Sequence, residues 1–188
     1  MLTRHASPTL LTFLAFAVAL FAIAAASTQD SSVVLYLFLT IINGFATGAS
    51  LNYTLVHLLH LTFEDTHFIV TSVLAMFRGF AGSFGSAIGG GIFQRVLQDA
   101  LSKGFEEEGL ERKDELIRKL LGSPRIVLTL TDVERMVAQE SYEQAIKYLF
   151  IFGGVLAVVA MLLQAGAGWR EPKQRELTED EIMHGGNV

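Results

Sequence analysis

The sequence predicts an all-α, multi-pass membrane protein with about four membrane-spanning helices. The chain of 188 residues is 51% hydrophobic and only 18% charged, and its mean hydropathy is +0.44. Four stretches are long and apolar enough to cross a hydrocarbon core about 30 Å thick. The net charge of -5 argues against nucleic acid as a partner, because phosphates repel an acidic surface. The partner that this composition predicts is the lipid bilayer.

The first predicted span is 9–26, an uncharged run that follows Arg4. Its length just suffices to cross a bilayer core. A signal peptide is the alternative, because Ala24 to Ser27 offers small residues for cleavage and Arg4 a preceding positive charge. The span is favoured, because the run exceeds the usual signal-peptide core of about 7 to 15 residues and more hydrophobic segments follow it.

The second predicted span, 33–56, carries one polar stripe that continues one turn beyond it. The polar residues recur at offsets of four, three, four and three, which keeps them within roughly a quarter of the helix circumference. They are Asn43, Thr47, Ser50, Thr54 and His57. Lipid tails offer no hydrogen bond to an amide or hydroxyl, so the polar stripe is expected to face neighbouring helices or a watery cavity.

The third predicted span, 68–92, is rich in small residues. Those at helical spacing are Gly82, Gly85, Ser86, Gly89 and Gly90, which we call the glycine stripe. Small residues three and four apart let two membrane helices approach closely, so helix packing is the favoured interpretation. A bendable helix that takes part in gating is the alternative, because glycines are common where membrane helices kink.

Arg78 is predicted to lie near the middle of the bilayer. It follows Phe68 by ten residues, which places it roughly 15 Å into the third span. Because a central arginine costs about 2.5 to 3.5 kcal/mol, it should face the protein interior or water. Two interpretations stay open: a structural arginine bonded to carbonyls of a neighbouring helix, and a residue of a substrate or ion pathway.

Residues 98–144 are predicted to lie outside the membrane, because charged residues are dense there. Two short amphipathic helices are expected at the membrane surface, and Thr131 with Glu134 forms a capping box for a helix that runs on into the last span. Glu106 to Glu108 is interpreted as a solvated charged face, because consecutive carboxylates on a helix point in different directions.

The last predicted span lies within 145–170 and ends at Trp169 and Arg170, an interfacial aromatic and a positive anchor. The tail, 171–188, is expected to be disordered. Its basic residues beside the membrane predict a cytosolic C-terminus. Four crossings then place the N-terminus in the cytosol as well.

Motifs for catalysis are absent from the sequence, so no enzymatic function is predicted and no cofactor or metal is expected. The chain has no cysteine, which excludes disulfides and thiolate zinc sites. His57 and His60 share a helix side, but no second pair of ligands fixes a metal geometry, so interface histidines are favoured. The apolar runs also contain no Asp or Glu, so the chain lacks the titrating carboxylate that a complete proton-driven carrier requires.

Four segments together resemble the C-terminal end of fungal major facilitator transporters. These segments are Asn43 to Gly48, Phe77 to Gly82, Leu121 to Pro124 and Gln164 to Arg170. The likeness is greatest to the fourteen-span drug:proton antiporter branch, which includes vacuolar basic amino acid permeases. The resemblance implies that these are the last four of fourteen spans, in a vacuolar or plasma membrane.

The expected function is therefore part of a secondary active transporter that moves drugs or basic amino acids by proton-coupled alternating access. The chain is expected to be truncated and to need the remaining transporter helices as partners. Under the resemblance, Asn43, Thr47, Ser50 and Thr54 would line the cavity, and Arg78 would hold a helix contact or bias the carrier between its openings. The alternative is a small membrane adaptor or assembly protein without transport activity.

Overall fold

The computed structural model describes residues 8–28, 31–109 and 114–167, and all regular structure in these ranges is helical. The elements are α1 (Pro8–Ala26), α2 (Val33–His60), η1 (Glu64–Thr66), α3 (His67–Glu107), α4 (Asp114–Gly122), η2 (Pro124–Thr129) and α5 (Asp132–Ala167), where η marks a 3-10 helix. Four of them, α1, α2, α3 and α5, are long and apolar enough to cross a membrane. The all-α prediction is confirmed, and the four predicted spans each fall on one of these helices.

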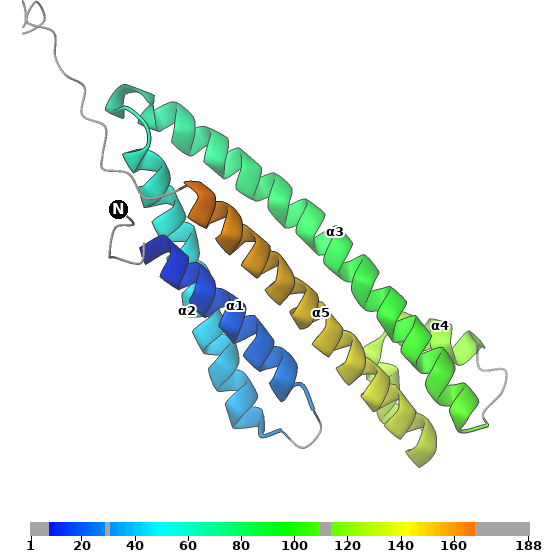
Figure 1. The fold of residues 1–188 in the computed structure, drawn as a ribbon. Coiled ribbons are helices and arrows are strands. Elements are labelled where there is room, and N and C mark those ends of the chain that lie inside the picture. The colour runs from blue at the N-terminus through cyan, green and yellow to red at the C-terminus, as the bar shows by residue number, and fades with distance from the viewer. Residues whose placement is uncertain (1–7, 29–30, 110–113, 168–188) are drawn as a thin grey trace, which may run out of the picture.

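The four long helices are packed in the order α2, α1, α5 and α3. α1 packs against both α2 and α5, and α3 packs against α5 (Figure 1). α2 and α3 follow each other in the chain, yet their backbones lie close together only near the short connection at residues 61–66 and then diverge (Figure 1). The arrangement therefore leaves one side of α2 and most of α3 without a neighbouring helix among the described residues.

The seam between α1 and α5 is built from small side chains. Ala17, Leu20 and Ala157 are buried there. At Gly154 a Cβ atom would lie 2.8 Å from Cζ of Phe21, which is closer than carbon atoms approach. Glycine and alanine thus let the two helices approach closely, as small residues do between membrane helices.

Beyond the apolar runs of the four long helices, α3, α4, η2 and the start of α5 form a compact unit that we call the headpiece, residues 93–109 and 114–145. Its core is apolar and consists of Leu97, Leu101, Phe105, Ile117, Leu120, Val127, Val137, Ala138 and Ala145. Leu97, Leu101 and Phe105 are four residues apart, so they form one stripe along α3 that faces α5. The headpiece thus has a hydrophobic core of its own.

The headpiece corrects the expectation of two short surface helices in residues 98–144. Among the described residues of this segment, α4 is the one short α-helix, because α3 continues to Glu107 and α5 already starts at Asp132. The reason is that the apolar stripe of α3 extends beyond the span and is covered by α4 and α5. The start of α5 directly after Thr131 confirms the helix boundary that the capping box predicts. Arg4 and the tail from Arg170 lie outside the described residues, so the predicted topology is untested.

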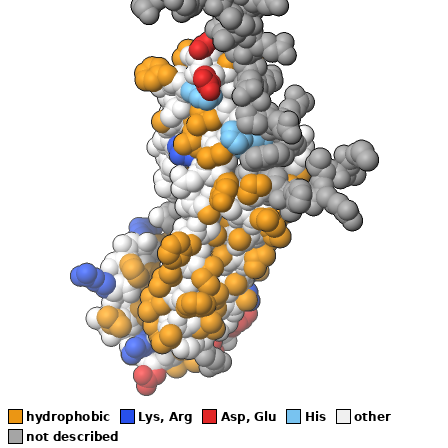
Figure 2. All heavy atoms as spheres, turned by 90° about the vertical axis from the view of Figure 1, so that its left-hand side faces the viewer, with side chains coloured by type: hydrophobic (Ala, Val, Ile, Leu, Met, Phe, Trp, Pro, Cys, Tyr) orange, Lys and Arg blue, Asp and Glu red, His pale blue; other side chains and the backbone are white. Residues whose placement is uncertain are grey.

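Large hydrophobic side chains cover the outside of the spans. Phe45 is 77% exposed, Phe68 82% and Val33 73%. Figure 2 shows hydrophobic side chains spread over one face of the molecule, with basic side chains mostly towards its lower end. Apolar patches of this extent are unusual on a protein that is surrounded by water. They suit helices surrounded by hydrocarbon.

Candidate functional site

The polar stripe of α2 is turned towards the interior of the helix bundle. Ser50 and His57 are buried, at 5% and 3% exposure. Asn43, Thr47 and Thr54 are partly buried. The opposite side of α2 carries large exposed hydrophobic residues such as Phe45. The orientation is the one expected for polar groups in a membrane helix.

The hydroxyl groups of the polar stripe donate to carbonyls of their own helix. Thr47 Oγ1 donates to the Asn43 carbonyl over 2.7 Å. Ser50 Oγ donates to Ala46 over 2.8 Å, and Thr54 Oγ1 donates to Ser50 over 2.6 Å. The side-chain oxygen of Asn43 is buried and has no hydrogen-bond partner among the described residues. Since each hydroxyl still has lone pairs, the stripe presents mainly hydrogen-bond acceptors.

Arg78 links the two spans that otherwise diverge. Its Nη2 donates a hydrogen bond of 2.6 Å to the carbonyl oxygen of Leu51 on α2. Leu51 lies next to Ser50 in the chain, so the guanidinium reaches the edge of the polar stripe. The Arg78 side chain nevertheless remains exposed. A guanidinium carries five N–H donors, and among the described residues no other bond to it is found.

A second polar contact joins α2 to α5. The side-chain amide of Gln164 lies 2.5 Å from Nδ1 of His57. Near the same end of the bundle, Nε2 of His67 lies 3.1 Å from the Leu59 carbonyl, which ties the start of α3 to the end of α2. Gln164 was not predicted as part of the site. The sequence feature that could have identified it is a single side-chain amide within an otherwise apolar run.

The histidines are not arranged as a metal centre. Across residues 8–28, 31–109 and 114–167, no three His, Cys, Asp or Glu side chains are placed to hold a metal ion. His57 and His67 instead bond to Gln164 and to a backbone carbonyl. The geometry of this end of the bundle is that of helix-to-helix contacts.

The glycine stripe faces open space over most of its length. A Cβ atom at Gly82, Gly85 or Gly90 would have no neighbouring atom within 4 Å. At Gly89 it would meet only Cδ1 of Leu149, at an ordinary 3.6 Å. Ser86 is exposed and donates to the Ser83 carbonyl on its own helix. Within the described part of the chain, therefore, the stripe is not the close helix contact that its spacing predicts.

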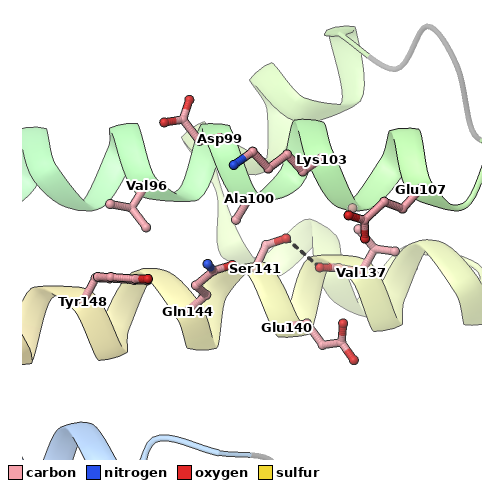
Figure 3. Close-up of a pocket in the computed structure, with 11 residues that line it drawn as sticks. Val96, Asp99, Ala100, Lys103, Glu107, Val137, Glu140, Ser141, Gln144 and Tyr148 are labelled. Atoms are coloured by element: carbon pink, nitrogen blue, oxygen red, sulfur yellow. Dashed lines mark hydrogen bonds between the residues drawn. The ribbon is translucent and has the colours of Figure 1, made fainter.

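The headpiece contains a polar groove of about 420 Å³ between α3 and α5. Its charged lining residues are Asp99, Lys103, Glu107 and Glu140. Figure 3 shows Asp99 pointing away from α5 and Glu140 pointing away from α3, so these carboxylates do not converge. The dashed line in Figure 3 joins Ser141 to the Val137 carbonyl, 2.7 Å away. The groove therefore offers no shared catalytic or metal-binding geometry.

Two headpiece residues have shifted acidities. The Lys119 ammonium, which lies 2.8 Å from the Glu115 carboxylate, lowers the pKa of that exposed carboxyl. Burial raises the pKa of the Tyr142 phenol, which lies just before the apolar run of α5. The protonated phenol donates a bond of 2.5 Å to the Leu120 carbonyl. The Tyr142 bond joins α5 to α4, whereas the Glu115–Lys119 pair lies on the exposed surface of α4 alone.

Comparison with known proteins gives no family model, no curated protein and no solved structure that matches the chain. The resemblance to major facilitator transporters therefore stays a prediction from sequence. The geometry of the four long helices is the basis for the functional argument that follows.

Proposed function

We propose that this chain forms part of the solute pathway of a membrane transporter, in which further helices complete the cavity. The observation that carries the proposal is the position of Arg78. It lies eleven residues into α3, about 16 Å from the start of that helix, and its guanidinium is exposed between two diverging spans. A charged side chain at this depth is tolerated if a polar pathway runs between α2 and α3.

The energy of burying a charge supports this placement. An arginine at the centre of a bilayer costs about 2.5 to 3.5 kcal/mol when no compensating environment is present. One hydrogen bond to the Leu51 carbonyl uses one of five donors. The other donors require water, an anionic group of a solute or polar groups of additional helices. Each of these belongs to a cavity and not to hydrocarbon.

The chemistry of Arg78 and of the polar stripe indicates the class of solute. Arg78 suits a carboxylate, with which a guanidinium forms charge-assisted bonds. The acceptors of the polar stripe, including the Asn43 side-chain oxygen, suit ammonium or guanidinium donors. A basic amino acid presents both kinds of group, whereas a simple cationic drug lacks the carboxylate. We therefore place basic amino acids first and cationic drugs second.

Proton coupling through a carboxylate requires an Asp or Glu outside the apolar runs of these four helices. The apolar runs of the four helices contain no Asp or Glu. An arginine stays protonated at all physiological pH values. The coupling carboxylate is therefore expected on the remaining helices of the carrier, and the chain alone is not expected to pump.

The test measures uptake of labelled lysine and arginine into vesicles from cells whose own gene carries Arg78→Ala. We expect at least a tenfold loss of uptake, because the solute carboxylate loses its partner. Arg78→Lys should retain part of the uptake, since the charge remains. Arg95→Gln, an exposed arginine outside the span, is the control and should transport normally. Equal uptake by the Arg78→Ala and unmodified vesicles would reject the pathway.

A membrane adaptor without transport activity is the second candidate. The exposed glycine stripe and the headpiece groove favour it, because both are surfaces on which another protein could dock. The adaptor function predicts that Arg78→Ala changes no solute flux. It also predicts that substitutions in the headpiece groove, such as Lys103→Glu, impair the function of the host complex, whereas the transporter function predicts little effect of that change.

A further inference from the structure

The polar stripe of α2 ends where η1 joins α2 to α3, at what we call the η1 end of the bundle. Its last member, His57, is only 3% exposed. Asn43 and Thr47, nearer the middle of the span, are less buried, and so is Thr54, which lies one turn before His57. Water or a solute that enters the stripe from the η1 end must therefore pass His57 first.

His57 is bonded to a side chain of another helix, Gln164 on α5. The Gln164 amide nitrogen lies 2.5 Å from Nδ1 of His57. Because an amide nitrogen donates and does not accept, the imidazole accepts this bond through Nδ1. α2 and α5 are not extensively packed on each other, since α1 contacts both of them (Figure 1). The His57–Gln164 contact thus bridges two helices that are not direct neighbours.

α3 is tied to α2 more firmly than α5 is at the same end. Nε2 of His67 lies 3.1 Å from the Leu59 carbonyl oxygen, and Arg78 donates to the Leu51 carbonyl. The connection at residues 61–66 also joins the two helices covalently. α5, in contrast, is bonded to α2 here through the side chain of Gln164. The end of α5 can therefore move away from α2 while α3 stays attached to it.

We propose that the His57–Gln164 contact is the gate that closes the solute pathway at the η1 end, an inference that rests on the proposed function. While the contact is made, His57 is held across the end of the polar stripe and shuts Thr54 off from water on that side. When it breaks, the end of α5 moves away from α2 and the stripe opens. A single side-chain hydrogen bond contributes only modestly to stability, so it can break in every transport cycle.

The test measures how fast a charged thiol reagent labels Thr54→Cys in sealed native membranes of both orientations. The chain has no cysteine of its own, so this thiol is the reporter. Glu64→Cys, exposed in η1, identifies the orientation in which the η1 end faces the reagent. In that orientation, Gln164→Leu should raise the labelling rate of Thr54→Cys at least threefold, because the gate stays open. Gln94→Leu, the same change at an exposed glutamine beyond the apolar run of α3, is the control and should leave the rate unchanged.

Substitutions of His57 test the other partner of the gate. His57→Leu removes the acceptor and should raise the labelling rate of Thr54→Cys as Gln164→Leu does. His57→Gln keeps an acceptor, its side-chain oxygen, so labelling should stay slow. The gate is overturned if Gln164→Leu leaves the rate unchanged. It is also overturned if Gln164→Leu accelerates the labelling of Phe45→Cys on the hydrophobic side equally, because the whole bundle would then have loosened.

Thr47→Cys separates a failure of the gate from a failure of the solute pathway. If Thr47→Cys is labelled from the headpiece side while Gln164→Leu has no effect on Thr54→Cys, the gate is wrong and the pathway stands. If Thr47→Cys is labelled from neither side, the pathway is wrong and the gate falls with it.

Discussion

The side chains of His57 and Gln164 meet across 107 residues of sequence, with the Gln164 amide nitrogen 2.5 Å from Nδ1 of His57. The contact joins α2 to α5 near the end of both helices. It is the longest-range hydrogen bond between side chains found in the described part of the chain. Because His57 is buried, the contact is expected to contribute to how α2 sits against the bundle.

Removal of this contact should lower the free energy of unfolding of the bundle by a modest amount. We predict that His57→Leu and Gln164→Leu show a coupling energy of about 0.6 to 1.7 kcal/mol, the range found for polar pairs in membrane proteins. A double-mutant cycle on equilibrium unfolding in mixed micelles measures it. Fully additive effects of the two changes would mean that the two side chains do not interact in the membrane.

Gly104 is a position where a side chain should not fit. A Cβ atom there would lie 2.7 Å from Cγ1 of Val137, a buried and β-branched residue that cannot swing aside. Gly104→Ala is therefore predicted to destabilise the headpiece by about 1 to 3 kcal/mol, as overpacking does. Thermal unfolding checks this, with Gly122→Ala as the control in open space. Equal midpoints for both variants would contradict the packing described.

Tyr142 is predicted to make headpiece stability depend on alkaline pH. Burial raises the pKa of its phenol above that of the unfolded chain. The stability that it contributes is therefore complete below about pH 10, the ordinary pKa of tyrosine, and is lost as the pH rises through the folded value. Tyr142→Phe should cost about 1 kcal/mol at pH 8, where the bond to Leu120 is lost.

A comparison of the unmodified chain with Tyr142→Phe between pH 8 and 11 isolates the contribution of the Tyr142 phenol to stability. Urea unfolding of the unmodified chain should show a decline at the alkaline end that is smaller in Tyr142→Phe. Parallel curves across the whole range would show that the phenol is not buried in the folded headpiece.

The glycine stripe is predicted to contact helices other than those described. Gly82→Leu should leave the thermal unfolding of the isolated chain unchanged, because nothing lies within 4 Å of the new Cβ. In native membranes the same change should release the chain from its larger assembly, visible as a faster band on native gels. Gly91→Leu is the matched control, because nine residues place it on the opposite side of α3 and it too lies in open space. If both variants stay in a band of the original size, the stripe is not an assembly contact.

The helices and the direction of the polar stripe were predictable because they depend on local periodicity. Offsets of three and four residues from Asn43 to His57 define one side of a helix whatever the helix packs against. The headpiece was missed because its core combines Leu97 and Leu101 with residues far along the chain, such as Val137. In the sequence, the many charged residues between them obscure that apolar spacing.

The partners of polar side chains could not be predicted from the sequence. The isolated positions of Arg78 and Gln164 in apolar runs show that each needs a partner, but several carbonyls and side chains lie at similar depth. The choice of Leu51 for Arg78 depends on how α2 and α3 meet at residues 61–66. Such a choice is a property of tertiary packing.

The most direct test of the central claim uses the absence of cysteine from the chain. Thr47→Cys places a thiol on the polar stripe, and Phe45→Cys places one two residues away on the hydrophobic side, where Phe45 is 77% exposed. Both variants are treated with a charged, water-soluble thiol reagent in sealed native membranes. We predict rapid labelling of Thr47→Cys and at least tenfold slower labelling of Phe45→Cys, because one side of α2 faces water and the other faces lipid. Equal rates at the two positions, or faster labelling of Phe45→Cys, would contradict a solute pathway along the polar stripe.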